Sequence, residues 1–183
     1  HPHFNCNKAI AVVHNGIIEG HEALREEILA RGHNVVSTTD SELAVHLFND
    51  ELEQHEDLKK AVMAFASQIR GAFAFIFMLV AHPDTLVVVR HRSPMVIGIG
   101  DDEAFVASDF IAFADKTNKV IFLPDDTFAF VHRDSVEMYD FSGRPIPYTI
   151  QVLDQSYVEI DKGAFEHFML KEIYEQKRAI SRT

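Results

Sequence analysis

Apolar residues in the first third of the chain follow first a strand spacing and then a helical one. Residues 9–13 form a short apolar run of strand length, and residues 22–29 place leucine and isoleucine at helical intervals among charged residues. After the apolar pair Val35–Val36, helical spacing returns in residues 37–52 and again in residues 58–69. The pattern therefore predicts the order strand, helix, strand, helix, helix.

From Gly71 onward the chain consists of short β-branched and aromatic runs that are separated by turn signals. The runs are GAFAFIFMLV, TLVVVRHR, MVIGIG, AFVASD, KVIFL, TFAFVH and SVEMYDF. Many antiparallel strands that follow a group of helices indicate layered sheets with helices outside, which is an α+β fold. Residues 163–183 return to helical spacing.

Composition narrows the range of partners and compartments. The 183 residues are enough for one sizeable core, so we expect one domain. The 17 basic and 28 acidic residues give a formal net charge of -11, which argues against nucleic acid because phosphate contacts require clustered lysine and arginine. Runs such as residues 72–80 are shorter than the roughly 20 residues of a membrane span, and a single cysteine gives no sign of an oxidising compartment. We expect a soluble, cytoplasmic protein.

The pair Asn15-Gly16 ends the first apolar run and has two interpretations. Asn-Gly is the commonest signal for a tight hairpin turn, because both residues tolerate a positive φ angle. Alternatively, an asparagine side-chain amide and a glycine N–H can both donate to a developing oxyanion during acyl transfer. An oxyanion hole requires a nucleophile, so the second interpretation depends on finding one.

Candidate nucleophiles and metal ligands are few. Cys6 is the only thiol, and its neighbours in the sequence provide no general base, so we expect it to be an incidental free cysteine. His1 and His3 are not joined by a carboxylate or a cysteine at a metal-ligand spacing. The sequence therefore predicts neither a metal site nor a cofactor.

The most specific motifs lie in residues 12–47, where His-Asn-Gly-Ile-Ile-Glu is followed by Thr-Asp-Ser-Glu at residues 39–42. Later stretches, RGAFAF, SPMVIGIG, FVASD and HFMLKEIYEQ, belong to the same pattern. Together they resemble the glutamine-hydrolysing domains of the glutamine:fructose-6-phosphate aminotransferase (isomerising) family. The resemblance covers essentially the whole chain.

The resemblance implies the N-terminal nucleophile hydrolase fold, a four-layer αββα sandwich of antiparallel sheets, here lacking its first strands. It places Asn15 and Gly16 at the oxyanion hole, where the Asn15 amide and the Gly16 N–H donate to the tetrahedral intermediate of glutamine hydrolysis. It also implies that Gly16 and Asp40 bind the substrate, with the Asp40 carboxylate on the α-ammonium group of glutamine. From the residues alone, Thr39, Asp40 and Ser41 are all candidate helix N-caps, and for Asp40 this role is compatible with substrate binding.

The chain departs from the family at its first residues. Family members begin, after removal of methionine, with a cysteine whose thiol attacks the glutamine amide and whose α-amino group is the general base. This chain begins with His1-Pro2-His3, and the family's Thr-Arg-Trp-Ala-Thr-His-Gly loop is missing, in agreement with the absence of tryptophan. We therefore expect the chain as given to be inactive alone, as an incomplete record, a fragment or a degenerate relative.

The resemblance also implies a domain organisation and partners. Residues 1–160 correspond to an ammonia-supplying glutaminase domain, and residues 161–183 correspond to a linker helix that leads to a sugar isomerase domain. L-Glutamine is then the substrate, fructose 6-phosphate becomes glucosamine 6-phosphate, and the intact protein is a homodimer that needs no cofactor. Two alternatives remain: the glutaminase domain of another class II amidotransferase, for purine or asparagine synthesis, and a non-catalytic regulatory domain that binds glutamine.

Overall fold

The computed structural model describes residues 1–154, 169–170 and 173–176. The chain divides into two compact units, His1–Val152 and Leu153–Thr183. Every strand of the described residues lies in the first unit.

In the second unit, residues 169–170 and 173–176 are helical. The rest of the linker helix predicted over residues 161–183, and the predicted domain boundary at residue 160, lie outside the described residues. In the part of the chain that the structure describes, no helix is both long and apolar enough to cross a lipid bilayer.

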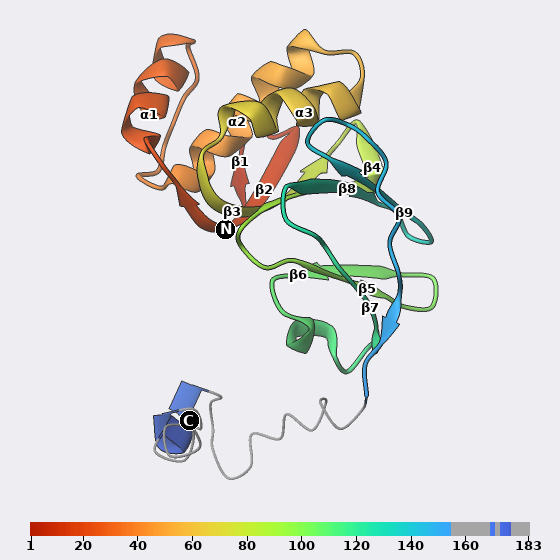
Figure 1. Ribbon diagram of the computed structural model, residues 1–183. Coiled ribbons are helices and arrows are strands. Elements are labelled where there is room, and N and C mark those ends of the chain that lie inside the picture. Colours follow the sequence, from red (N-terminus) through yellow and green to blue (C-terminus); the bar gives the residue numbers. More distant parts are fainter. Residues whose placement is uncertain (155–168, 171–172, 177–183) are drawn as a thin grey trace. The chain divides into compact units, whose positions relative to one another are not determined.

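Two antiparallel sheets form the centre of the first unit (Figure 1). The six-stranded sheet has the order β1-β2-β3-β4-β8-β9, and the four-stranded sheet has the order β10-β7-β5-β6. The strands are β1 His3–Phe4, β2 Ile10–Ile18, β3 Gly71–Leu79, β4 His82–His91, β5 Val96–Ile99, β6 Ala104–Ala107, β7 Lys119–Phe122, β8 Thr127–Val131, β9 Val136–Asp140 and β10 Gln151–Val152. Each apolar run predicted from Gly71 onward overlaps one of these strands, which confirms the predicted β-rich region.

Helices lie on the side of the six-stranded sheet that is remote from the four-stranded sheet (Figure 1). They are α1 His21–Ala30, α2 Asp40–Gln54 and α3 Leu58–Gln68. All three predicted helices are confirmed. The first half of α2 is buried on every side, because it packs against β2, α1 and α3.

The period of two along β3 divides the core into two clusters. Phe75 and Phe77 face the helices, where the Phe75 ring centroid lies 5.5 Å from that of Phe65 and the Phe77 centroid lies 4.3 Å from that of Phe48. Ala74, which precedes Phe75, faces the four-stranded sheet and belongs to the second cluster, which fills the space between the sheets. Over residues 73–75 of β3 the sheet is therefore buried on both faces.

The outer face of the four-stranded sheet is covered by a short 3-10 helix, η1 Phe110–Phe113. Ile97 belongs to the cluster between the sheets, so the next residue, Gly98, points outward. There it contacts Phe113, whose ring would lie 2.5 Å from a Cβ at Gly98. The two antiparallel sheets of the expected sandwich are confirmed, and η1 is the helical element that the described residues contribute to this outer face.

The short strand expected at Val35–Val36 is wrong, because residues 33–36 have no regular secondary structure. Instead, the backbone N–H groups of Val36 and Ser37 donate to the Glu42 carboxylate at 2.8 and 2.6 Å. Burial alone would raise the pKa of Glu42, but the hydrogen bonds from Ser37 and Val36 outweigh it and hold the pKa below its ordinary value. A buried carboxylate thus replaces a strand partner for this loop.

The sequence leaves three candidate N-caps for α2, at residues 39–41. The N-cap of α2 is Thr39, and Asp40 is the first residue within the helix. The interpretation of Asp40 as the N-cap is therefore wrong. Its carboxylate still lies at the helix N-terminus, where the helix dipole stabilises a negative charge.

We predict that Glu42→Gln lowers the free energy of unfolding by about 1.5–3 kcal/mol, because the two backbone donors lose a charged acceptor. Since the pKa of Glu42 is lowered in the fold, this contribution is present above its ordinary pKa of 4.5 and is lost as the pH falls through the folded-state value. Urea unfolding at a series of pH values measures both effects. Glu53→Gln, on the exposed side of the same helix, is the matched control and changes stability by no more than about 0.5 kcal/mol. Equal losses for the two variants would contradict the prediction.

Candidate functional site

Strand β2 continues through the Asn-Gly pair without interruption. Asn15 is paired with Ala74 and Gly16 with Phe73, and the strand ends only at Ile18. The hairpin-turn interpretation is therefore wrong. The pairing of the whole strand with β3 outweighs the local turn preference of Asn-Gly.

Gly16 occupies a position that only glycine fills without strain. Its φ angle is +136°, and a Cβ there would lie 2.0 Å from the backbone oxygen of Ala72 on β3. Gly71, at the other strand of the same close approach, has a φ angle of +118° and would place a Cβ 2.1 Å from the oxygen of Ile17. Each strand therefore carries a glycine where its backbone comes close to that of the other strand.

Asp40 is hydrogen-bonded to β2 from the first turn of α2. Its Oδ2 atom accepts the backbone N–H of Ile18 at 2.7 Å. Its Oδ1 atom lies 3.8 Å from Nδ1 of His14. Because His14 and Ile18 flank Gly16 at equal distance along the strand, the carboxylate lies alongside the residue that has no side chain.

His14 is a site residue that the sequence interpretation missed. Its side chain is buried beneath α2, with Nδ1 2.9 Å from the Ser41 hydroxyl and the ring centroid 4.4 Å from that of the stacked Phe75. Burial lowers the pKa of His14, and the Asp40 carboxylate opposes this shift only in part. The sequence signal that could have identified it is the alternation of side chains along β2, because His14 lies two residues after the buried Val12 and so points to the same face.

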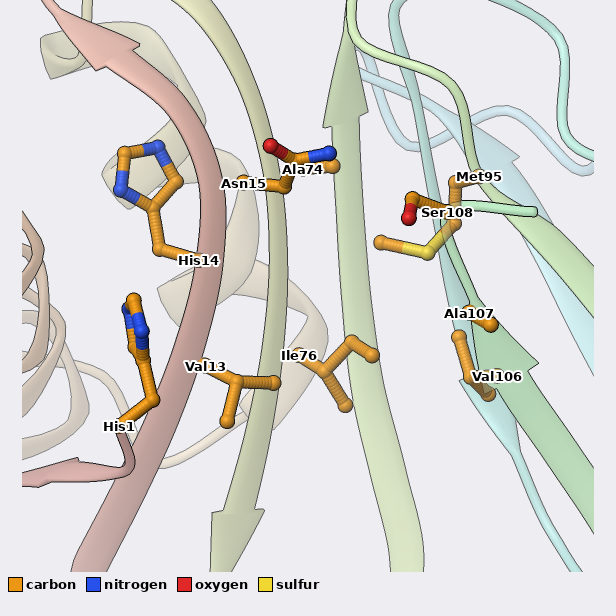
Figure 2. Close-up of a pocket in the computed structure, with 10 residues that line it drawn as sticks. All are labelled: His1, Val13, His14, Asn15, Ala74, Ile76, Met95, Val106, Ala107 and Ser108. Carbon is orange, nitrogen blue, oxygen red and sulfur yellow. The ribbon is translucent and has the colours of Figure 1, made fainter. Parts of the chain in front are cut away.

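A cavity of about 320 Å³ lies beside Asn15, between β2 and β3 on one side and β6 on the other (Figure 2). Polar side chains of His1, Asn15 and Ser108 line it, with the apolar residues Val13, Ala74, Ile76, Met95, Val106 and Ala107; His14 is also among the lining residues, although its side chain packs on the helical face of β2. Asn15 is exposed, so its amide is accessible from the cavity. An apolar pocket with a few polar groups is typical of a small-ligand site.

The structure brings the three predicted site residues close to one short segment of β2. Asn15 lines the cavity, Gly16 follows it, and Asp40 contacts the strand beyond Gly16. Cys6, the only thiol, does not line this cavity.

Two groups of potential metal ligands lie outside this cavity in the described residues. One is Cys6 with His33 and His46, and the other is His91 with Asp125 and Asp126 on the surface. A hydrogen bond from the backbone of Arg92 holds the pKa of Asp125 below its ordinary value.

Comparison with protein families identifies one family that matches the larger part of the chain. The family described as "Glutamine amidotransferase domain" matches residues 1–115. The chain is also similar over all of its 183 residues to proteins named "Glutamine--fructose-6-phosphate aminotransferase [isomerizing]", with 45% identity for Escherichia coli (strain K12) and 40% for Pseudomonas syringae pv. tomato. It spans 30% of the length of these curated relatives.

Comparison with solved structures supports the fold. One similar structure is the glutamine phosphoribosylpyrophosphate (PRPP) amidotransferase of B. subtilis complexed with ADP and GMP, with a TM-score of 0.61, 22% identity, and coverage of 74% of this chain and 30% of that one. A second, titled as the allosteric regulatory enzyme of purine biosynthesis, has a TM-score of 0.61 and 23% identity, and covers 72% of this chain and 28% of that one. At these identities the similarity concerns the fold alone.

We predict that Gly16→Ala destabilises the β2–β3 pairing by about 1–3 kcal/mol more than Gly20→Ala does, because a methyl group at residue 16 overlaps the backbone of β3. Gly20 is a close control: its φ angle is also positive, at +70°, yet a Cβ there has no neighbour within 4 Å. Hydrogen exchange of the β2 and β3 amides in each variant measures the difference. Similar protection in both variants would contradict the close approach at Gly16.

We further predict that His14 makes the folded state sensitive to acid. Because its pKa is lowered from 6.5 by burial, the unfolded chain takes up a proton at a higher pH than the folded chain, so stability falls as the pH drops below 6.5. His14→Asn removes this part of the pH dependence, while the exposed control His82→Asn retains it. Urea unfolding at about pH 7.5 and about pH 5.5 tests this, and identical slopes for the two variants would overturn it.

Proposed function

Because this chain belongs to the family of glutamine amidotransferase domains, we propose that it forms the glutamine-hydrolysing part of a glutamine:fructose-6-phosphate aminotransferase. The observation that carries the proposal is the carboxylate of Asp40, which is bound to β2 beside the Asn15-Gly16 pair. The identity of 45% over the whole chain to the E. coli aminotransferase supports the choice of this aminotransferase.

In this proposal Asp40 binds the α-ammonium group of glutamine. Its Oδ2 atom is occupied by the Ile18 N–H at 2.7 Å, which fixes the orientation of the carboxylate. Its Oδ1 atom has longer contacts, at 3.5 Å to the Ser41 hydroxyl and 3.8 Å to His14, so it retains the capacity to accept a charged N–H. The side chain is 20% exposed, which leaves it accessible to a small ligand.

Asn15 and Gly16 supply the oxyanion hole in this proposal. The Asn15 amide lies at the edge of a cavity that is mostly apolar, where a hydrogen bond to a developing negative charge is stronger than in water. Gly16 follows Asn15 on the strand and lies alongside the Asp40 carboxylate, so all three groups lie at one short segment of β2. The two residues stabilise the tetrahedral intermediate and leave the bond-making step to another group.

We assign the attacking nucleophile to a residue of the full-length protein that is not among these 183 residues. The resemblance implies an N-terminal cysteine in that role, and Cys6, the only thiol here, does not line the cavity. This chain therefore contributes substrate binding and transition-state stabilisation. Glutamine is hydrolysed to glutamate, and the ammonia is passed to a sugar isomerase domain of the same protein, which we propose to be a cytoplasmic homodimer.

The proposal is tested on the full-length protein that contains this chain. With glutamine and fructose 6-phosphate, we expect equal amounts of glutamate and glucosamine 6-phosphate. Amination of phosphoribosyl pyrophosphate or of aspartate instead would favour the purine or asparagine alternative. Glutamine binding without turnover, measured by calorimetry, would favour the regulatory alternative.

We predict that Asn15→Ala lowers kcat for glutamine hydrolysis by about 10²- to 10³-fold and changes KM little, because a transition-state donor is lost. Steady-state glutaminase assays of the full-length protein separate the two constants. A rise in KM with unchanged kcat would place Asn15 in ground-state binding and contradict the assignment.

We predict the opposite pattern for Asp40→Asn. The neutral amide keeps a hydrogen-bond acceptor for Ile18 but loses the charge that binds the ammonium group, so KM for glutamine rises by about 10-fold or more. Asp84→Asn, an exposed change on β4, is the control and leaves both constants unchanged. An unaltered KM in Asp40→Asn would refute the assignment.

A further inference from the structure

A cluster of potential metal ligands is assembled from three separate segments on the helical side of the six-stranded sheet. Cys6 lies in the turn between β1 and β2, His33 lies between α1 and α2, and His46 lies within α2. Cys6 is an exposed residue, whereas the side chains of His33 and His46 are 12% and 1% exposed. The group therefore combines one exposed residue with two largely buried imidazoles.

The spacing of the ligand atoms matches that of a tetrahedral centre. Sγ of Cys6 lies 3.6 Å from Nδ1 of His33 and 3.8 Å from Nδ1 of His46, and all three atoms lie within 4.8 Å of one another. Zinc bonds of about 2.3 Å to sulfur and about 2.0–2.1 Å to nitrogen, at tetrahedral angles, place sulfur and nitrogen about 3.6 Å apart. The three atoms thus need little movement to share one ion.

Each imidazole presents its second nitrogen to a carboxylate. Nε2 of His33 lies 2.6 Å from Oδ1 of Asp50, whose other oxygen is bound by Arg31 at 2.9 Å. Nε2 of His46 is buried without a hydrogen-bond partner in the described residues and lies 3.8 Å from Oε1 of Glu42. The Asp50 carboxylate holds the proton on Nε2 of His33 and leaves its Nδ1 lone pair directed at the sulfur. Glu42 is the nearest carboxylate to Nε2 of His46, at a distance too long for a hydrogen bond.

The sulfur also has a partner suited to a thiolate. The backbone N–H of Asn34 donates to Sγ of Cys6 at 3.3 Å. A backbone donor stabilises negative charge on sulfur, and a thiolate is the form of cysteine that binds metals. Thiolate, imidazole, carboxylate support and an open fourth position together fit zinc among the divalent metals.

We propose that Cys6, His33 and His46 bind one zinc ion, with water or an external ligand at the fourth position. The ion joins the β1–β2 turn, the loop before α2 and α2 itself, so its main effect is to fix the loop that leads to Asp40. The zinc proposal does not rest on the proposed glutaminase function, and none of the three ligands lines the cavity beside Asn15.

Cobalt(II) titration of the full-length, metal-stripped protein tests the proposal. We expect about one Co²⁺ per chain at this site, with the near-ultraviolet thiolate-to-cobalt band and intense visible bands of a tetrahedral centre, and displacement by Zn²⁺. Cys6→Ser abolishes the charge-transfer band. Asp50→Asn keeps the ligands but weakens binding by about 10- to 100-fold, because His33 loses its orienting carboxylate.

His82→Asn, an exposed histidine on β4, is the control and leaves the spectrum and the affinity unchanged. Far-ultraviolet circular dichroism of the metal-free variants checks that each one is folded; Cys6 is exposed, so Cys6→Ser alters no buried packing. A wild-type protein without the thiolate band, or a band that survives in Cys6→Ser, would overturn the proposal. If the wild-type protein shows the cobalt spectrum but does not hydrolyse glutamine, the result counts against the proposed function and not against the zinc site.

Discussion

The pairing of β2 with β3 is the constraint on which the rest of the structure depends. The two strands are in register from Ile10 opposite Leu79 to Ile18 opposite Gly71. At the end where they approach most closely, both strands carry glycine, and a methyl group on either one would overlap the other backbone. This register directs the phenylalanines of β3 toward the helices and Ala74 toward the second sheet, so both cores follow from it.

The same pairing divides the chemistry of β2 between two faces. His14 points toward α2, where it meets Ser41, and Asn15 lines the cavity between the sheets. In a turn, His14 and Asn15 would lie together on one exposed loop. In a strand, successive side chains point to opposite faces of the sheet, so the two residues are separated. Gly16 then allows the close approach of β2 to β3, and the Ile18 N–H fixes the Asp40 carboxylate beside it.

Much of the fold could be predicted because its signals are local: the helices follow helical apolar spacing, and each run after residue 70 has the composition of a strand. The continuation of β2 through Asn15-Gly16 could not, because the decisive contacts come from β3, far along the chain. The strand predicted at Val35–Val36 was wrong for a similar reason. The Glu42 carboxylate, and not a neighbouring strand, accepts the backbone N–H of Val36. Cys6 lies 27 and 40 residues from the two histidines it meets, so no motif spacing joins them.

Helix α2 carries Asp40, Glu42, His46 and Asp50 in one rigid element of 15 residues. Each residue inserted into an α-helix turns everything beyond it by about 100° and shifts it by about 1.5 Å. A single insertion between residues 42 and 46 would therefore leave Asp40 on β2 while rotating His46 away from Cys6. A change of chain length within α2 therefore cannot keep both the contact with β2 and the contact with Cys6, so the two sites depend on the rotational phase of one helix.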